Sequence, residues 1–129
     1  MSERILVNTN DAPAAVGPYA QAVKVGTMLY TSGQIPLALD GTLVDGDVEM
    51  QTRQVLANLT AVLRAGGSDP ARVVKCTVYL ADIADFQRVN AVYAETFTDA
   101  PPARSAFQVG ALPFGAAVEI EAIAVCDPG

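Results

Sequence analysis

Arg104 is the residue of this chain whose setting best suits the binding of a small molecule. It follows Pro101-Pro102, which stiffen the entry to a strand expected over residues 104–109. Successive side chains of a strand point to opposite faces, so Arg104 and Phe107 lie on different sides of the sheet. Of the two sets of side chains on this strand, the one that includes Phe107 is more apolar than the one that includes Arg104. We expect the more apolar set to face the helices. Arg104 is therefore expected to face the other, mixed side.

A guanidinium in that position requires an anion. Its planar fork matches a ligand carboxylate, but a structural ion pair between Arg104 and Glu119 or Glu121 fits the residues as well. Glu119 and Glu121 share one face of one strand, where carboxylate pKa values are readily perturbed. One of them could hold and deprotonate a water molecule. The alternative is that Glu121 pairs with a basic side chain and Glu119 caps a loop.

Three further side chains could each give a hydrogen bond to a substrate: Tyr19, Ser32 and Asn90. As isolated residues, a loop Tyr, a strand-end Ser and a helical Asn are more often structural. The turns at Gly17 and Gly33 lie in neither of the glycine patterns that bind phosphate.

Composition excludes several kinds of chemistry. The chain has no histidine, which removes histidine triads, an imidazole base and histidine metal ligands. Cys76 and Cys126 are too far apart in sequence for a CxxC motif, and we expect neither a metal nor a redox site there. Eight scattered basic residues against 14 acidic ones give a net charge of −6, so we expect no nucleic-acid partner.

The expected location is the cytoplasm. Two unpaired thiols suit a reducing compartment, although the sequence does not exclude a disulfide. No apolar run resembles a signal peptide or is long enough to cross a membrane, so we expect no membrane partner. Only 17% of the residues are charged, which indicates that some apolar surface is buried against partner subunits.

The pattern of apolar residues predicts one α+β domain over residues 1–129. Its sheet is expected to be antiparallel or mixed, with two helices on one face. The expected elements are a strand at 5–7, a hairpin at 22–25 and 28–31, a helix at 48–64, a strand at 73–80, a helix at 83–97, and strands at 104–109 and 117–125. In the strand at 73–80, we expect Val74 to share a face with Cys76.

The last strand has an unusual second face. Glu119, Glu121, Ile123 and Val125 share that face, and they alternate along the strand with a row of small and aliphatic residues. Carboxylates mixed with aliphatic side chains suit neither plain solvent nor a dry core. This pattern indicates a sheet face covered by other subunits, with a polar pocket at one end.

Six segments together resemble the RidA (YjgF, reactive intermediate/imine deaminase) family. They occur in the family's order over nearly the whole chain: Ala14-Ala15-Val16-Gly17-Pro18-Tyr19, Thr31-Ser32-Gly33-Gln34-Ile35-Pro36, Val74-Lys75-Cys76-Thr77-Val78-Tyr79, Val89-Asn90-Ala91-Val92-Tyr93, Pro102-Ala103-Arg104-Ser105 and Val118-Glu119-Ile120-Glu121-Ala122-Ile123-Ala124-Val125.

The resemblance implies a chorismate-mutase-like (YjgF) fold: a mixed six-stranded sheet with two helices on one face. It also implies a homotrimer with a central β-barrel and with active sites between adjacent subunits. The implied reaction is hydrolysis of enamines and imines, such as 2-aminoacrylate, to 2-keto acids and ammonia, as in 2-iminobutanoate/2-iminopropanoate deaminases. No cofactor and no metal are implied.

The resemblance also implies roles for single residues. Arg104 would bind the substrate carboxylate with help from the backbone N–H of Ala106, and Glu119 would position the attacking water. The pocket would be shaped by Tyr19, Ser32, Gly33 and Asn90. Many relatives have Cys where this chain has Ala106, so a thiol-dependent step or oxidative regulation at that position is not expected here.

Two other classes of function compete with the deaminase. One is a non-catalytic trimeric module that binds 2-keto acids or similar metabolites, or that acts as a chaperone-like surface. The other is an endoribonuclease, a name that some relatives carry. The acidic charge and the lack of histidine or a basic patch argue against the endoribonuclease.

Overall fold

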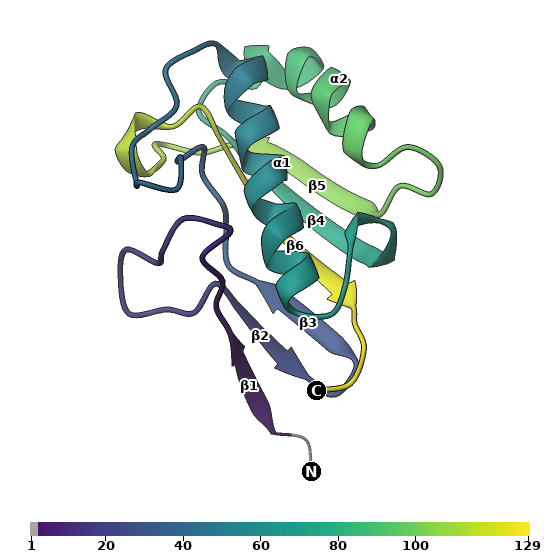
Figure 1. Cartoon of the computed structure of the whole chain (residues 1–129). Coiled ribbons are helices and arrows are strands. Elements are labelled where there is room, and N and C mark those ends of the chain that lie inside the picture. Colours follow the sequence, from purple (N-terminus) through teal and green to yellow (C-terminus); the bar gives the residue numbers. More distant parts are fainter. Residues whose placement is uncertain (1–2) are drawn as a thin grey trace.

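A mixed six-stranded sheet with two helices on one face forms the framework (Figure 1). The computed structural model describes residues 3–129; Met1 and Ser2, which begin the predicted domain, lie outside the described residues. The elements are β1 (Arg4–Val7), β2 (Ala22–Val25), β3 (Met28–Thr31), α1 (Val48–Ala65), β4 (Val73–Leu80), α2 (Phe86–Thr96), β5 (Ala103–Gln108) and β6 (Val118–Val125). The predicted sheet with its two helices is therefore confirmed. The trimer and the barrel stay predictions.

The order of strands across the sheet is β1-β2-β3-β6-β4-β5. Only β4 and β5 pair in parallel, and the other pairs are antiparallel. A parallel pair needs a crossover connection, which α2 supplies here. The crossover leaves β5 at an edge of the sheet, with α2 over the same region (Figure 1).

Helix α1 begins and ends where the sequence indicates. The side chain of Asp47 accepts a hydrogen bond from the backbone N–H of Met50 at 2.9 Å, as expected of an N-cap. At the other end Gly67 has φ +80°, a conformation that glycine adopts without strain. Between these ends Val55, Leu59 and Val62 are buried against the sheet.

Several boundaries differ from the predictions by one residue, and one helix and two side-chain orientations differ by more. The helix predicted over 83–97 is a 3-10 turn at Ile83–Asp85 followed by α2. A register shift between Val73 and Lys75 turns Val74 outward to 44% exposure, so the prediction that it shares the buried face of Cys76 is wrong. Such a bulge locally breaks the alternation of a strand.

The side chain of Arg104 lies on the opposite face of the sheet from the one predicted. In the parallel pair, Arg104 is in register with Cys76, which is fully buried under the helices. Residues in register share a face, so Arg104 faces α2, not the side away from the helices. Phe107 instead packs edge-on against Tyr79 on the open face, at a ring distance of 5.4 Å. The prediction failed because it placed the more apolar set of β5 under the helices.

The open face of the sheet otherwise matches the prediction. In β6 the side chains of Glu119, Glu121 and Ile123 are half-buried, whereas the alternate residues form part of the core. Leu6 and Tyr30 on neighbouring strands add exposed apolar area to this face, at 59% and 46% exposure.

Cys76 and Cys126 are both buried and free, which agrees with their interpretation as small core residues. Over residues 3–129, the helices are too short or too polar to cross a bilayer.

A buried side-chain amide on α1 holds the loop before this helix in place by hydrogen bonds. The side-chain NH2 of Asn58 on α1 donates to the carbonyls of Ile35 and Leu37 at 3.2 and 2.9 Å. Its oxygen accepts a hydrogen bond from Gln54. Asn58 is 2% exposed, so these hydrogen bonds form where water cannot replace them.

We expect Asn58→Ala to lower the free energy of unfolding by about 2–3 kcal/mol, because two buried carbonyls lose their donor. Urea denaturation of the variant measures this loss. Thr60→Ala, on the same helix but only half-buried, is the matched control. A loss no greater than that of the control would contradict the assignment.

Candidate functional site

One face of α2 holds the guanidinium of Arg104. Its Nη1 donates to the side-chain oxygen of Asn90 at 2.8 Å. Its Cζ lies 4.8 Å from the ring centroid of Tyr93 and 5.5 Å from that of Phe86. These three partners are spaced four and three residues apart, so they share one side of the helix. Sequence reasoning gave Phe86 and Tyr93 no role in the site, although their spacing around Asn90 is a signal that could have indicated one.

The charge of Arg104 is not neutralised by the described part of the chain. Within residues 3–129, the basic residues that form ion pairs are Arg53, Arg72 and Arg88. The alternative of a structural pair between Arg104 and Glu119 or Glu121 is therefore wrong for the single chain. A half-buried guanidinium whose other N–H donors lack an anion is suited to bind one.

Ala106 lies on the same face of β5 as Arg104, two residues further along. Its methyl group packs against the hydrophobic core. The edge position of β5 leaves one side of its backbone without a neighbouring strand, so polar groups along that side are open to a ligand or a partner.

A second group of predicted site residues surrounds Glu119 on the open face. A Cβ atom on Gly33 would overlap Oε2 of Glu119, so a larger residue there would displace the carboxyl group from this position. The neighbouring residues Gln34 and Ile120 exchange two backbone hydrogen bonds of 2.8 and 3.1 Å. These bonds hold Gly33 against the Glu119 carboxyl group.

Two effects raise the pKa of Glu119 above its ordinary value. Burial is the larger, and the nearby carboxylate of Glu121 adds to it. Glu121 itself accepts a hydrogen bond from the hydroxyl of Tyr79 at 2.8 Å, rather than pairing with a basic side chain. Burial and this bond raise the pKa of Tyr79 to about 12. Glu119 is therefore the carboxyl group best suited to exchange a proton.

Tyr19 and Ser32 lie next to this group but are partly engaged by the protein. The Ser32 hydroxyl donates to the carbonyl of Ala20 at 2.6 Å, which fastens the loop before β2. The Tyr19 hydroxyl accepts a hydrogen bond from the N–H of Val16 at 3.3 Å, and it keeps its own proton to donate. Tyr19 and Ser32 both line a hollow of about 560 Å³.

The predicted site residues thus form two groups on opposite faces of one sheet. Arg104 and Ala106 lie on the edge strand β5, and Asn90 contacts Arg104 from α2 above it. Tyr19, Ser32, Gly33 and Glu119 lie around the start of β6, where Glu119 projects from the open face together with Tyr79. Within one chain, a small ligand held by Arg104 does not face Glu119.

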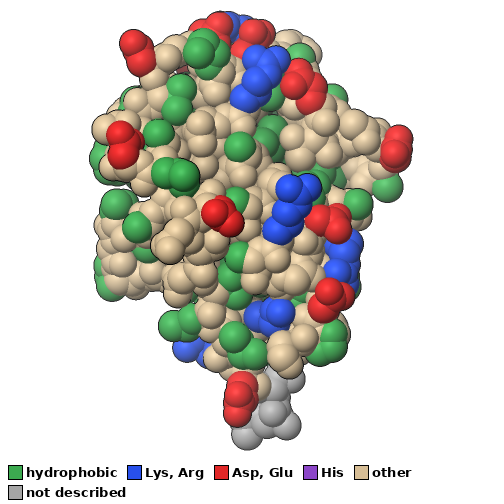
Figure 2. Space-filling model, viewed as in Figure 1, with side chains coloured by type: hydrophobic (Ala, Val, Ile, Leu, Met, Phe, Trp, Pro, Cys, Tyr) green, Lys and Arg blue, Asp and Glu red, His purple; other side chains and the backbone are tan. Residues whose placement is uncertain are grey.

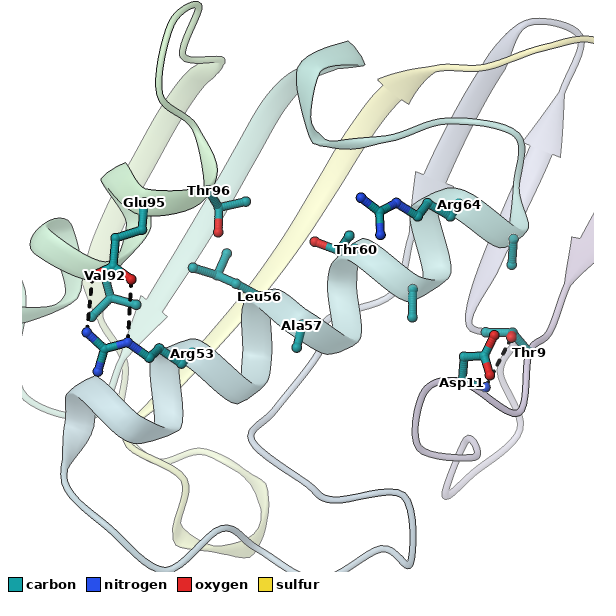
Figure 3. Close-up of a pocket in the computed structure, with 12 residues that line it drawn as sticks. Thr9, Asp11, Arg53, Leu56, Ala57, Thr60, Arg64, Val92, Glu95 and Thr96 are labelled. Atoms are coloured by element: carbon teal, nitrogen blue, oxygen red, sulfur yellow. Dashed lines mark hydrogen bonds and ion pairs between the residues drawn. The ribbon is translucent and has the colours of Figure 1, made fainter.

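Another hollow, of about 710 Å³, lies away from both groups. Figure 3 shows it along the exposed side of α1, between α2 and the loop that carries Thr9 and Asp11. Arg53 in this hollow is already paired with Glu95 at 3.1 Å. None of the predicted site residues lines it. Residues 3–129 also contain no cluster of three or more acidic or Cys side chains suited to a metal ion.

Comparison with known proteins gives consistent matches over most of the chain. The family model described as Endoribonuclease L-PSP matches residues 9–126. Protein DfrA of Myxococcus xanthus is 53% identical over 125 residues, which cover 95% of each chain. A 2-iminobutanoate/2-iminopropanoate deaminase of Bos taurus is 51% identical over 126 residues, covering 97% of this chain and 92% of the relative.

Solved structures match the fold equally well. RidA from the Antarctic bacterium Psychrobacter has a TM-score of 0.90 at 43% identity, over 94% of this chain and 98% of that chain. TdcF of E. coli with bound serine has a TM-score of 0.90 at 40% identity, over 95% of this chain and 99% of that chain.

The raised pKa of Glu119 predicts a pH-dependent stability. The folded state holds the proton of Glu119 more tightly than the unfolded chain, so its favourable contribution is present below pH 4.5 and is lost as the pH rises through the folded pKa. Glu119→Gln removes this loss. We expect the variant to be more stable than the parent at pH 7, with the difference vanishing towards about pH 4.

Denaturation at several pH values measures the difference. Asp99→Asn, which changes an exposed carboxylate, is the control and should leave the pH dependence unchanged. A Glu119→Gln difference that stays constant with pH would exclude a raised pKa.

Proposed function

The chain belongs to the Endoribonuclease L-PSP family, which is the RidA (YjgF) family indicated by its motifs, and from this premise we propose that it is an imine deaminase. It hydrolyses reactive enamines and imines such as 2-aminoacrylate to 2-keto acids and ammonia. The observation that carries the proposal is the guanidinium of Arg104, which is held on α2 without a carboxylate partner in the described chain.

Arg104 binds the substrate carboxylate in this proposal. Every imine that yields a 2-keto acid carries such a group beside the reacting carbon. An arginine is charged at any physiological pH, so its role is to bind and orient and not to move protons. The backbone N–H of Ala106 is the proposed second donor, which the replacement of Cys by Ala preserves.

Glu119 is the acid–base group that activates the attacking water in this proposal. The enamine first becomes its imine tautomer; water then adds across the C=N bond, and the resulting carbinolamine loses ammonia to leave the keto acid. Glu119 takes a proton from the attacking water and returns one to the departing nitrogen. A carboxyl group with a raised pKa suits this exchange at neutral pH. Because imine hydrolysis has a low barrier, positioning and one acid–base group suffice.

The opposite orientations of Arg104 and Glu119 favour a site shared by two subunits. We infer a homotrimer in which the open sheet faces pack together and the Glu119 group of one subunit meets the β5 edge of the next. The half-buried carboxylates and the exposed Leu6 and Tyr30 on that face support burial against other copies. The two free thiols support a cytoplasmic location.

The remaining residues shape this shared pocket. Tyr19 offers its hydroxyl proton to the substrate, while Ser32 and Gly33 form the wall beside Glu119. Asn90 acts through Arg104, since its oxygen accepts a hydrogen bond from the guanidinium. It is therefore a positioning residue in this proposal, rather than a residue that contacts the substrate.

A metabolite-binding module remains the second candidate, because a similar protein, TdcF, binds serine. Its site would use the same Arg104 without turnover. The endoribonuclease named in the family model finds less support in this chain. Figure 2 shows acidic and basic side chains interspersed over the helix-bearing face, with no basic stripe for a phosphate backbone.

Arg104→Ala tests the substrate-binding role. A pyridoxal-phosphate dehydratase can generate 2-aminoacrylate in situ, and pyruvate formation is then followed. We expect a loss of about 2–5 kcal/mol in transition-state binding, which is about 30- to 4000-fold in kcat/KM. Arg64→Ala, which removes an exposed arginine of α1, should retain full activity. If the parent protein does not accelerate hydrolysis at all, the binding module replaces the deaminase.

Mixing two inactive variants tests the shared site. Arg104→Ala and Glu119→Gln chains, unfolded together and refolded, should form trimers in which some interfaces carry both intact residues. Random assembly of equal amounts gives about a quarter of the parental activity. Each variant refolded alone is the control. Activity no higher than that of the separate variants would place both residues in one subunit's site.

A further inference from the structure

The aromatic side chains around Arg104 have a role of their own. Phe86 and Tyr93 contact the guanidinium through their rings, at 5.5 and 4.8 Å, on either side of Asn90 along α2. We propose that Phe86 and Tyr93 are positioning residues, which fix the direction in which Arg104 presents its free N–H groups to a carboxylate. This inference rests on the proposed function, because the carboxylate is that of the substrate or product.

The kind of contact explains why rings, and not a second polar group, suit this position. One hydrogen bond to the side-chain oxygen of Asn90 leaves the long arginine side chain free to rotate about that bond. A ring attracts the cation through its π face without using any N–H donor. The donors in the guanidinium plane therefore stay available for a ligand. A carboxylate in place of either ring would accept hydrogen bonds from these N–H donors and would compete with the substrate for them.

The hydroxyl of Tyr93 does not take part in holding Arg104. It is buried beside the thiol of Cys76, a weak hydrogen-bond partner, and within residues 3–129 it makes no hydrogen bond to a nitrogen or oxygen atom. Because a thiol is a weak hydrogen-bond partner, removing the hydroxyl should change the free energy of unfolding little. The ring and the hydroxyl can thus be separated: Tyr93→Phe keeps the first and removes the second, whereas Tyr93→Leu removes both.

The experiment compares Tyr93→Leu, Phe86→Leu and Tyr93→Phe in the assembled protein. Two quantities are measured: KM and kcat for 2-aminoacrylate hydrolysis, and the Kd of pyruvate by NMR titration. We expect each Leu variant to raise KM and the Kd of pyruvate by about tenfold while kcat stays within about twofold, since ground-state binding is lost. Tyr93→Phe, which keeps the ring, should raise KM and the Kd of pyruvate by much less than Tyr93→Leu does.

A double variant separates positioning from a general structural effect. In the Arg104→Ala background, Tyr93→Leu should weaken pyruvate binding no further, because the ring acts only through the arginine. A further loss in that background would overturn the proposal. Equal losses in Tyr93→Phe and Tyr93→Leu would also overturn it, since the hydroxyl would then be responsible.

Two controls keep the outcome interpretable. Phe86 is only partly buried, so Phe86→Leu decides the question if Tyr93→Leu does not fold. If the parent protein binds pyruvate but does not accelerate hydrolysis, the deaminase fails while the Kd series still tests the positioning role. Parental Kd values in both Leu variants would overturn the positioning role whatever the turnover.

Discussion

The parallel pairing of β4 with β5 is the constraint on which the rest of the site depends. It requires a crossover, and the crossover helix α2 then lies directly over the edge strand. Arg104 is in register with the buried Cys76, so its side chain enters the space between sheet and helix. There Asn90 and two aromatic rings hold it without neutralising it. A positive charge kept in this state stays available to a negative ligand that reaches it from the open edge.

The opposite face depends on a second close contact. Gly33 approaches Glu119 so closely that a side chain in its place would displace the carboxyl group, and the paired backbones of Gln34 and Ile120 keep Gly33 there. Glu121 stays beside Glu119 because Tyr79 accommodates its charge. The result is one carboxyl group with a raised pKa next to one with a satisfied hydrogen bond. Two neighbouring acids on one strand thereby acquire different chemistry from their surroundings alone.

Sequence reasoning predicted most of the fold because its signals are local. The cap at Asp47, the glycines after α1 and the alternation in β6 each act within a few residues. The orientation of Arg104 could not be obtained this way. Alternation defines two faces of β5 but does not say which of them meets the helix; that depends on register with β4, a contact distant in sequence. The motif resemblance identified Arg104 and Glu119, whereas the contacts of Phe86 and Tyr93 required coordinates.

The placement of the two groups on opposite faces has a genetic consequence under the proposed assembly. Each subunit would contribute its Arg104 to the site shared with one neighbour and its Glu119 to the site shared with the other neighbour. A chain damaged in both groups, yet still able to fold, would spoil two of the three sites in every trimer it enters. Such an allele would be dominant over a normal copy, whereas an allele that prevents folding would be recessive.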